Sequence, residues 1–282
     1  MPSLILSMLK RNAWRFSFAW FGTLFEMVLF ALSPWLLGKA IDGMQTGSST
    51  VFSWYVGLLA VLFITGIFRR MYDTRVFSGA WRHMANEVLG TMIGRKVESK
   101  RILTAQNLCF RFADFFEWNV QNMARGIVEF LVGSIVLCLT LPAVGSISVC
   151  LGMVGLVCRW FEVKKRGIED HKLQQTQDDV NDAVVNGDMA AVEKGNARKA
   201  KLFIKMSDYE AVGWGCCDLL YLVSEIMVVL ALVKSDAQPG EILACVSYVW
   251  RMFGGISSVG FGGQQLNGVF VAEKKLENDL KG

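Results

Sequence analysis

The sequence predicts an all-α membrane protein with six transmembrane helices that continue into long polar extensions. Of its 282 residues 53% are apolar, and the mean hydropathy is +0.37, which is too high for an ordinary soluble domain. Two long polar stretches without proline, residues 69–111 and 159–210, each lie between apolar runs. The whole chain, residues 1–282, is expected to form a single domain of this kind.

Six apolar runs are candidates for spanning helices, each of which needs about 20 residues. They are residues 14–37, 51–68, 126–141, 143–157, 211–233 and 242–270. The first span is expected to end at Ser33-Pro34-Trp35, because Trp35 suits a membrane interface. Pro142 separates the third and fourth spans, and Gln238-Pro239-Gly240 is a turn signal before the sixth.

Both polar stretches are predicted to run out of the membrane as helices and back again. After the second span the helical pattern continues to about residue 101, and a turn is expected near residues 104–107. Residues 159–210 are rich in good helix formers, with a turn expected near residues 181–187. The connections on the opposite side are short.

Lysine and arginine placement predicts the orientation. Of the 29 basic residues, 25 lie in the N-terminal segment, the two polar stretches and the C-terminal tail. Basic residues concentrate on the cytoplasmic side, so both termini and both polar stretches are expected to be cytoplasmic, in the inner membrane. This distribution accounts for the net charge of +4 without a nucleic-acid partner. Seven cysteines without a CxxC pair, mostly in apolar runs, indicate neither disulfides nor a metal site.

Four segments in this order resemble the membrane domain of ABC exporters. They are LSPWLLGKAIDG (32–43), FRFAD (110–114), PGEILACVSYV (239–249) and AEKKLENDL (272–280). The resemblance covers nearly the whole chain. It implies a homodimer in which the fourth and fifth spans reach across to the partner.

The resemblance also implies short coupling helices at the tips of the polar excursions, at about residues 98–106 and 176–186. The polar residues there are Glu98, Lys100, Arg101, Gln106, Thr176, Asp178, Asp179 and Asn186.

The phosphate-cradling motif GxxxxGK[ST] does not occur, so no ATPase domain, enzymatic activity or cofactor is expected on these 282 residues. The run Gly260-Phe-Gly-Gly-Gln-Gln265 superficially resembles an ATPase signature loop. It lies in the sixth apolar span, and its small residues are instead expected to allow close helix packing.

Four charged residues fall inside predicted spans: Glu26, Glu129, Glu225 and Arg251. Counted from the outer helix ends at 1.5 Å per residue, they lie about 12–18 Å deep, near the middle of the hydrocarbon core. Such groups usually face a bundle interior or a wet cavity. Either they form a polar transport cavity with proton coupling, or Arg251 pairs with one glutamate as a structural bridge.

The sequence therefore predicts a transporter that works by alternating access without its own ATPase. Its energy source is a proton gradient (secondary transport) or a separately encoded ATPase. A membrane regulator or scaffold is a third interpretation, against which the four charges argue. The expected partners are a second copy of the chain, membrane lipid, a transported substrate and, in the second case, an ATP-binding subunit.

Overall fold

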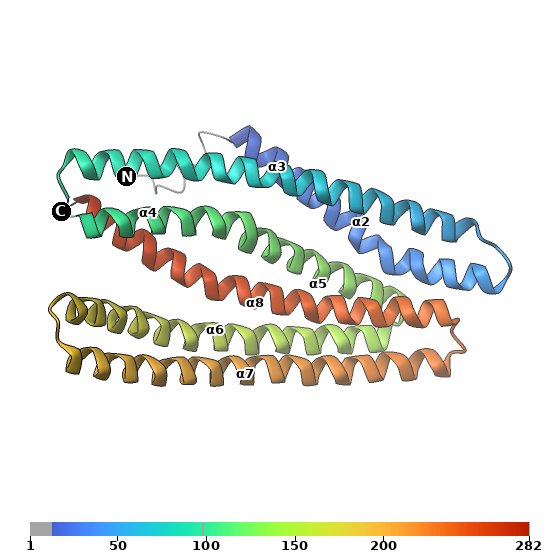
Figure 1. Ribbon diagram of the computed structural model, residues 1–282. Helices are drawn as coiled ribbons and strands as arrows, with labels where there is room; N and C mark the ends of the chain where they lie inside the picture. The colour runs from blue at the N-terminus through green and yellow to red at the C-terminus, as the bar shows by residue number, and fades with distance from the viewer. Residues whose placement is uncertain (1–12, 98, 282) are drawn as a thin grey trace.

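The computed structural model describes residues 13–97 and 99–281, and this part of the chain is helical almost throughout (Figure 1). Its elements are α2 (Ala13–Gln45), α3 (Thr50–Gly94), α4 (Ser99–Asp114), the π-helical turn η1 (Phe115–Asn119), α5 (Val120–Thr140), α6 (Pro142–Val185), α7 (Met189–Lys234) and α8 (Pro239–Lys281). Six of the resulting helical segments are long and apolar enough to cross a membrane. The predicted class, an all-α membrane protein with six spans, is confirmed.

Four of the helices are far longer than a membrane requires. α3, α6, α7 and α8 have 45, 44, 46 and 43 residues, which corresponds to roughly 65–70 Å at 1.5 Å per residue. The hydrocarbon core is about 30 Å thick. Each of these helices combines an apolar part with a polar part, and the polar parts lie at the same end of the molecule (Figure 1).

The helices pack in pairs around α8. α2 pairs with α3, α5 pairs with α8, and α6 pairs with α7. Figure 1 shows α8 between α5 and α6, with the α2–α3 pair on one side and α6–α7 on the other. α8 contacts α2, α6 and α7 as well as α5, so it is the central helix of the described chain.

Proline and glycine define three of the turns as the sequence predicts. Pro142 is the first residue of α6, and Pro239 is the first residue of α8, where the missing N–H costs nothing. Gly187 has a φ of +71° and closes α6, and Asp188 then caps α7 by accepting a hydrogen bond from the Ala191 N–H at 3.0 Å.

The expected turn near residues 104–107 is wrong. α3 ends earlier, and Lys96 takes the left-handed conformation with a φ of +56°. The Lys96 N–H donates to Ile93 and the Val97 N–H to Met92, which is the hydrogen-bond pattern of a Schellman motif. Because a lysine occupies the position where glycine is usual, the sequence gives little sign of this turn.

Glycines let the central helix approach its neighbours closely. A Cβ on Gly126 would lie 2.5 Å from the Gly255 carbonyl oxygen, and one on Gly38 would lie 2.4 Å from the Gly240 carbonyl oxygen. The expectation for residues 260–263 is confirmed, since Gly260 faces the Arg159 guanidinium and Gly262 faces the Met123 side chain. Association of helices in lipid relies on such contacts between small residues.

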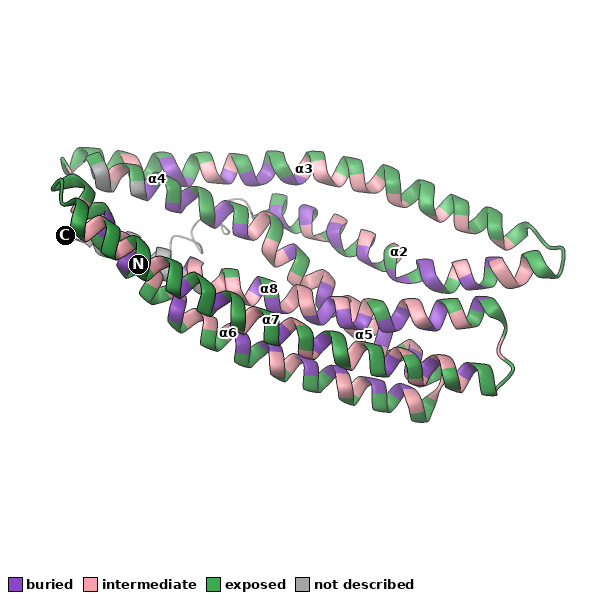
Figure 2. Cartoon of the chain, turned by 60° about the horizontal axis from the view of Figure 1, so that its bottom comes forward, coloured by how far each residue is buried: buried purple, intermediate pink, exposed green. Residues whose placement is uncertain are grey.

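Buried apolar side chains form two separate clusters. The polar-end core contains Phe77, Val88, Met92, Phe112 and their neighbours, which lie on α2, α3, α4, η1 and α8. The membrane core contains Leu137, Val228, Val249, Met252 and their neighbours on α5, α7 and α8. In contrast, the most apolar stretch of α3 has no buried residue, so it faces outward along its length (Figure 2).

Candidate functional site

Pro34 leaves a backbone carbonyl without its helical partner. The first span was expected to end here, but α2 continues to Gln45 with Pro34 inside it. Proline has no N–H to donate to the carbonyl four residues earlier, which is that of Phe30. Arg251 on α8 donates one hydrogen bond to this carbonyl and a second, at 2.9 Å, to the Ser33 hydroxyl. Its guanidinium also lies over the Phe30 ring, 3.9 Å from the centroid.

A second bond from α8 lies beside the first. The Tyr248 hydroxyl donates to the Ala31 carbonyl at 3.0 Å. Backbone groups inside a membrane must find partners within the protein. Two α8 side chains therefore supply partners to adjacent carbonyls in the turn of α2 that contains Pro34, which explains why the helix continues past the proline.

A cavity of about 560 Å³ opens next to this contact. Its lining includes Glu129 on α5, Arg251 on α8, Tyr55 on α3 and Tyr221 on α7, together with Pro34. Glu129 is half-buried and makes no ion pair among the described residues, although Arg125 and Arg251 are close enough to interact electrostatically with it. Two of the four predicted charges, Glu129 and Arg251, therefore share one cavity.

Glu26 is in a different environment, because two arginines bind its carboxylate. Arg69 pairs with one oxygen, and Arg125 pairs with the other at 3.0 Å. Arg69 also binds the buried Asp73 at 2.7 Å and the Gln121 side-chain oxygen at 2.9 Å. These side chains join α2, α3 and α5 in a network whose charges balance, which is the usual condition for buried charge.

Glu225 lies outside the cavity lining. It is half-buried on α7, one turn from Tyr221, whose phenol interacts with its carboxylate. The structural bridge between Arg251 and a glutamate is not seen in the described chain. Arg251 donates its hydrogen bonds to α2, and Glu26 forms its ion pair with Arg69 instead.

Sequence reasoning missed a buried ion pair farther along the molecule. Arg159 and Glu162 on α6 are almost completely buried and form an ion pair with each other. The Gln264 amide of α8 donates to Glu162 at 2.6 Å, and the Arg159 guanidinium lies 4.6 Å from the ring centroid of Trp214 on α7. Arg159 and Glu162 lie at the beginning of the polar stretch, where the sequence predicts charges exposed to water. Nothing in the neighbouring sequence indicates that α7 and α8 cover them.

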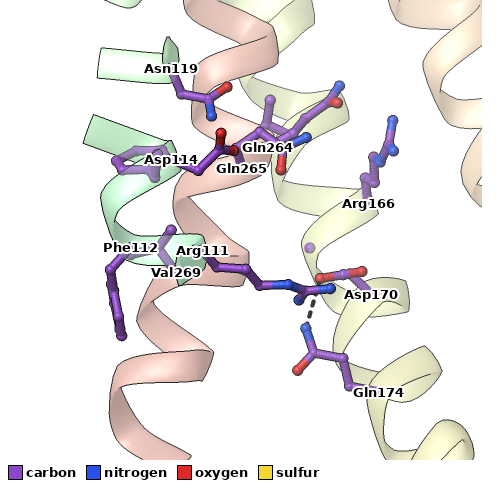
Figure 3. A pocket seen from close by; sticks show the side chains of 14 residues that line it. Arg111, Phe112, Asp114, Asn119, Arg166, Asp170, Gln174, Gln264, Gln265 and Val269 are labelled. Carbon is purple, nitrogen blue, oxygen red and sulfur yellow. Dashed lines mark hydrogen bonds between the residues drawn. The ribbon is translucent and has the colours of Figure 1, made fainter. Parts of the chain in front are cut away.

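A polar pocket of about 360 Å³ lies beside this buried pair, between α4, η1, α6 and α8 (Figure 3). Arg111, Arg166, Asp114 and Asp170 line it together with the amides of Gln264 and Gln265. Arg166 is already paired with Glu210 and Asp170 accepts from the Gln174 amide at 3.2 Å, so part of this charge is satisfied within the protein. Gln264 connects the pocket to Glu162.

The tips of the polar excursions differ from the expected pair of short helices. Residues 176–185 are the last turns of α6, which runs unbroken to Val185 because no proline or glycine lies between Gly167 and Gly187. Thr176 is buried and bonds the Lys172 carbonyl, whereas Asp178, Asp179 and Asn186 are exposed.

At the other tip, Glu98 lies outside the described residues. Lys100 and Arg101 belong to the start of α4, and the exposed Gln106 lies in the middle of this helix.

The comparison with known families agrees with this architecture. Residues 6–238 match the model of the family described as the ABC transporter transmembrane region. No curated protein matches the chain. The match covers most of the sequence and five of the six spans, and so the chain belongs to the ABC transporter transmembrane region family.

Proposed function

We propose that the chain is one half of a homodimeric transporter that moves its substrate by alternating access, coupled to protons through Glu129. The family supports a transporter membrane domain. The observation that carries the proton coupling is the state of Glu129, which is half-buried in a 560 Å³ cavity without an ion pair among the described residues. A carboxylate in such surroundings can change its protonation when its access to water changes.

The proposed setting follows the distribution of charge and the symmetry of oligomers. The chain is placed in the inner membrane with both termini and the polar halves in the cytoplasm, because basic residues favour that side. The homodimer is proposed because closed two-fold assemblies are the commonest homo-oligomers, and a second copy would complete a two-sided pathway. Membrane lipid is the proposed partner of the outward face of α3, whose most apolar stretch has no buried residue.

Glu129→Gln is expected to abolish pH-driven uptake in proteoliposomes, since glutamine keeps the shape and hydrogen bonding of a protonated glutamate but cannot titrate. Purified protein is reconstituted under an imposed pH gradient with a pooled small-molecule extract, and accumulated compounds are identified by mass spectrometry. Glu225→Gln is the matched control, because Glu225 lies outside the cavity. Full uptake by Glu129→Gln would refute the role of this residue.

A separately encoded ATPase is the second candidate energy source, and the tips favour it. Val185 and Met189 flank the α6–α7 turn and are 72% and 74% exposed, and Leu103 near the other tip is 62% exposed. Apolar side chains gathered at the far ends of polar extensions suggest contact with a protein partner. In contrast, a regulator or scaffold would not need the charged cavity.

The purified chain alone is expected neither to bind nor to hydrolyse ATP, because its sequence lacks a phosphate loop. Nucleotide binding by calorimetry and phosphate release are measured on the reconstituted protein. If an ATPase supplies the energy, Val185→Asp should prevent its binding, whereas Asp179→Ala at a nearby exposed position should not. ATP hydrolysis by the chain alone would contradict the absence of an ATPase.

A further inference from the structure

We propose that Arg251 acts as a latch between α8 and α2, which it holds through its hydrogen bond to the Phe30 carbonyl. An ionised Glu129 competes with this carbonyl for Arg251, so release of the latch depends on the charge of Glu129. This inference rests on the proposed function, because it assigns a physical link between proton binding and opening of the cavity. The starting observation is that Arg251 occupies the place of the N–H that Pro34 lacks.

Arginine can exchange one partner for the other without leaving the cavity. Its guanidinium carries five N–H donors in a planar fork, and the structure uses two of them on α2, at the Phe30 carbonyl and the Ser33 hydroxyl. Glu129 lines the same cavity. The bonds to α2 join a cation to neutral oxygens, whereas an ionised Glu129 would add charge–charge attraction to its hydrogen bonds, so it is the stronger attraction.

The surrounding charges set this competition. The groups that interact electrostatically with Arg251 are Glu129 and Arg125 on α5, Tyr55 on α3 and Tyr248 on α8. Arg125 also interacts with Glu129, but one of its nitrogens is bound to Glu26. Glu129 is therefore the acidic partner available to the latch.

Release of the latch would let water into the cavity. Once Arg251 leaves, the Phe30 carbonyl has no protein donor, and a backbone carbonyl deprived of its partner in an apolar region recruits water or is destabilised. Two other contacts between α2 and α8 do not involve Glu129: Tyr248 donates to Ala31, and the Gly240 N–H donates to Asp42. α2 would stay attached at these points while the cavity beside Pro34 opens.

The test measures opening of the cavity with a single cysteine. Ser247 lines the cavity, and Ser247→Cys is introduced into a chain whose native cysteines are replaced by alanine or serine. A membrane-impermeant maleimide is added to one side of sealed vesicles, and the labelling rate is followed from acid to alkaline pH. If Arg251 acts as this latch, the labelling rate must rise as Glu129 ionises. The rise is about tenfold if the equilibrium between the closed and the open cavity changes by 1.4 kcal/mol.

Two substitutions should change this response in opposite directions. Glu129→Gln removes the competitor, so labelling should stay slow at every pH. Pro34→Ala gives the Phe30 carbonyl an ordinary helical N–H, so Arg251 loses a partner and labelling should become faster. Glu225→Gln is the control and should keep the pH response of the parent.

The latch is overturned if Glu129→Gln keeps the parent's pH response, or if Pro34→Ala labels at the parent's rate. These outcomes can be separated from failure of the proposed function. If Glu129→Gln abolishes uptake but leaves labelling unchanged, the transport proposal stands and the latch does not. If labelling responds as expected but no compound is taken up under a pH gradient, the latch stands and the transport proposal fails.

Discussion

Gly255→Ala is expected to destabilise the protein strongly, because it forces α5 and α8 apart where their backbones come close together. A Cβ on Gly255 would lie 2.3 Å from the Gly126 carbonyl oxygen and 3.1 Å from the Phe130 nitrogen. These are backbone atoms, which cannot rotate aside as a side chain can. Overpacking usually costs about 1–3 kcal/mol, and a clash of two backbones belongs at or above the upper end of that range.

The neighbouring glycine is a control for this experiment. A Cβ on Gly254 would meet no atom within 4 Å, so Gly254→Ala adds the same methyl group to the same turn of α8 without a clash. Alanine is also a better helix former than glycine by about 1 kcal/mol. Thermal unfolding in lipid nanodiscs should show Gly254→Ala at or above the parent and Gly255→Ala far below it. Equal unfolding temperatures would show that the close approach of α5 and α8 does not matter for stability.

Arg159→Met is expected to lower the free energy of unfolding by about 3–5 kcal/mol, since it leaves Glu162 buried without its cation. The loss should be smaller in the double variant Arg159→Met, Glu162→Gln, which removes the stranded charge and leaves an amide beside Gln264. This non-additivity separates the cost of an unpaired charge from the loss of packing against Trp214. Unfolding by denaturant in a fixed detergent gives the comparison.

Arg166→Met is the matched control, because Arg166 also lies on α6 and also pairs with a glutamate. The side chains of Arg166 and Glu210 are 25% and 34% exposed, against 1% and 2% for Arg159 and Glu162. A solvent-accessible ion pair is typically worth about 0–1 kcal/mol. If Arg159→Met costs no more than Arg166→Met, the buried pair is not a structural requirement.

The sequence was sufficient to predict the six spans, because each depends on an apolar run whose length the membrane sets. The turns at Pro142 and Pro239 and the close packing around Gly260 were also predictable, since the chemistry of proline and glycine acts over a few residues. The end of α3 was not, because a left-handed Lys96 takes the role of a glycine.

Partners that are distant in sequence account for the other differences. The continuation of α2 past Pro34 depends on Arg251, which is 221 residues away from the carbonyl that it binds. Four charges at similar depth suggested one site, but depth along a helix does not say which face a side chain occupies. In the structure Glu26 forms ion pairs with Arg69 and Arg125, whereas Glu129 and Arg251 line one cavity.

The division of the buried apolar side chains into two clusters means that different forces hold the two ends of the molecule together. The polar-end core is built on helices that extend past the bilayer, so water drives its burial, with the large heat-capacity change that accompanies exposure of apolar surface. The membrane core has lipid as its solvent, and close contacts such as Gly126 with Gly255 replace that driving force. Cooling and urea therefore weaken the first end, whereas the thickness and composition of the bilayer act on the second.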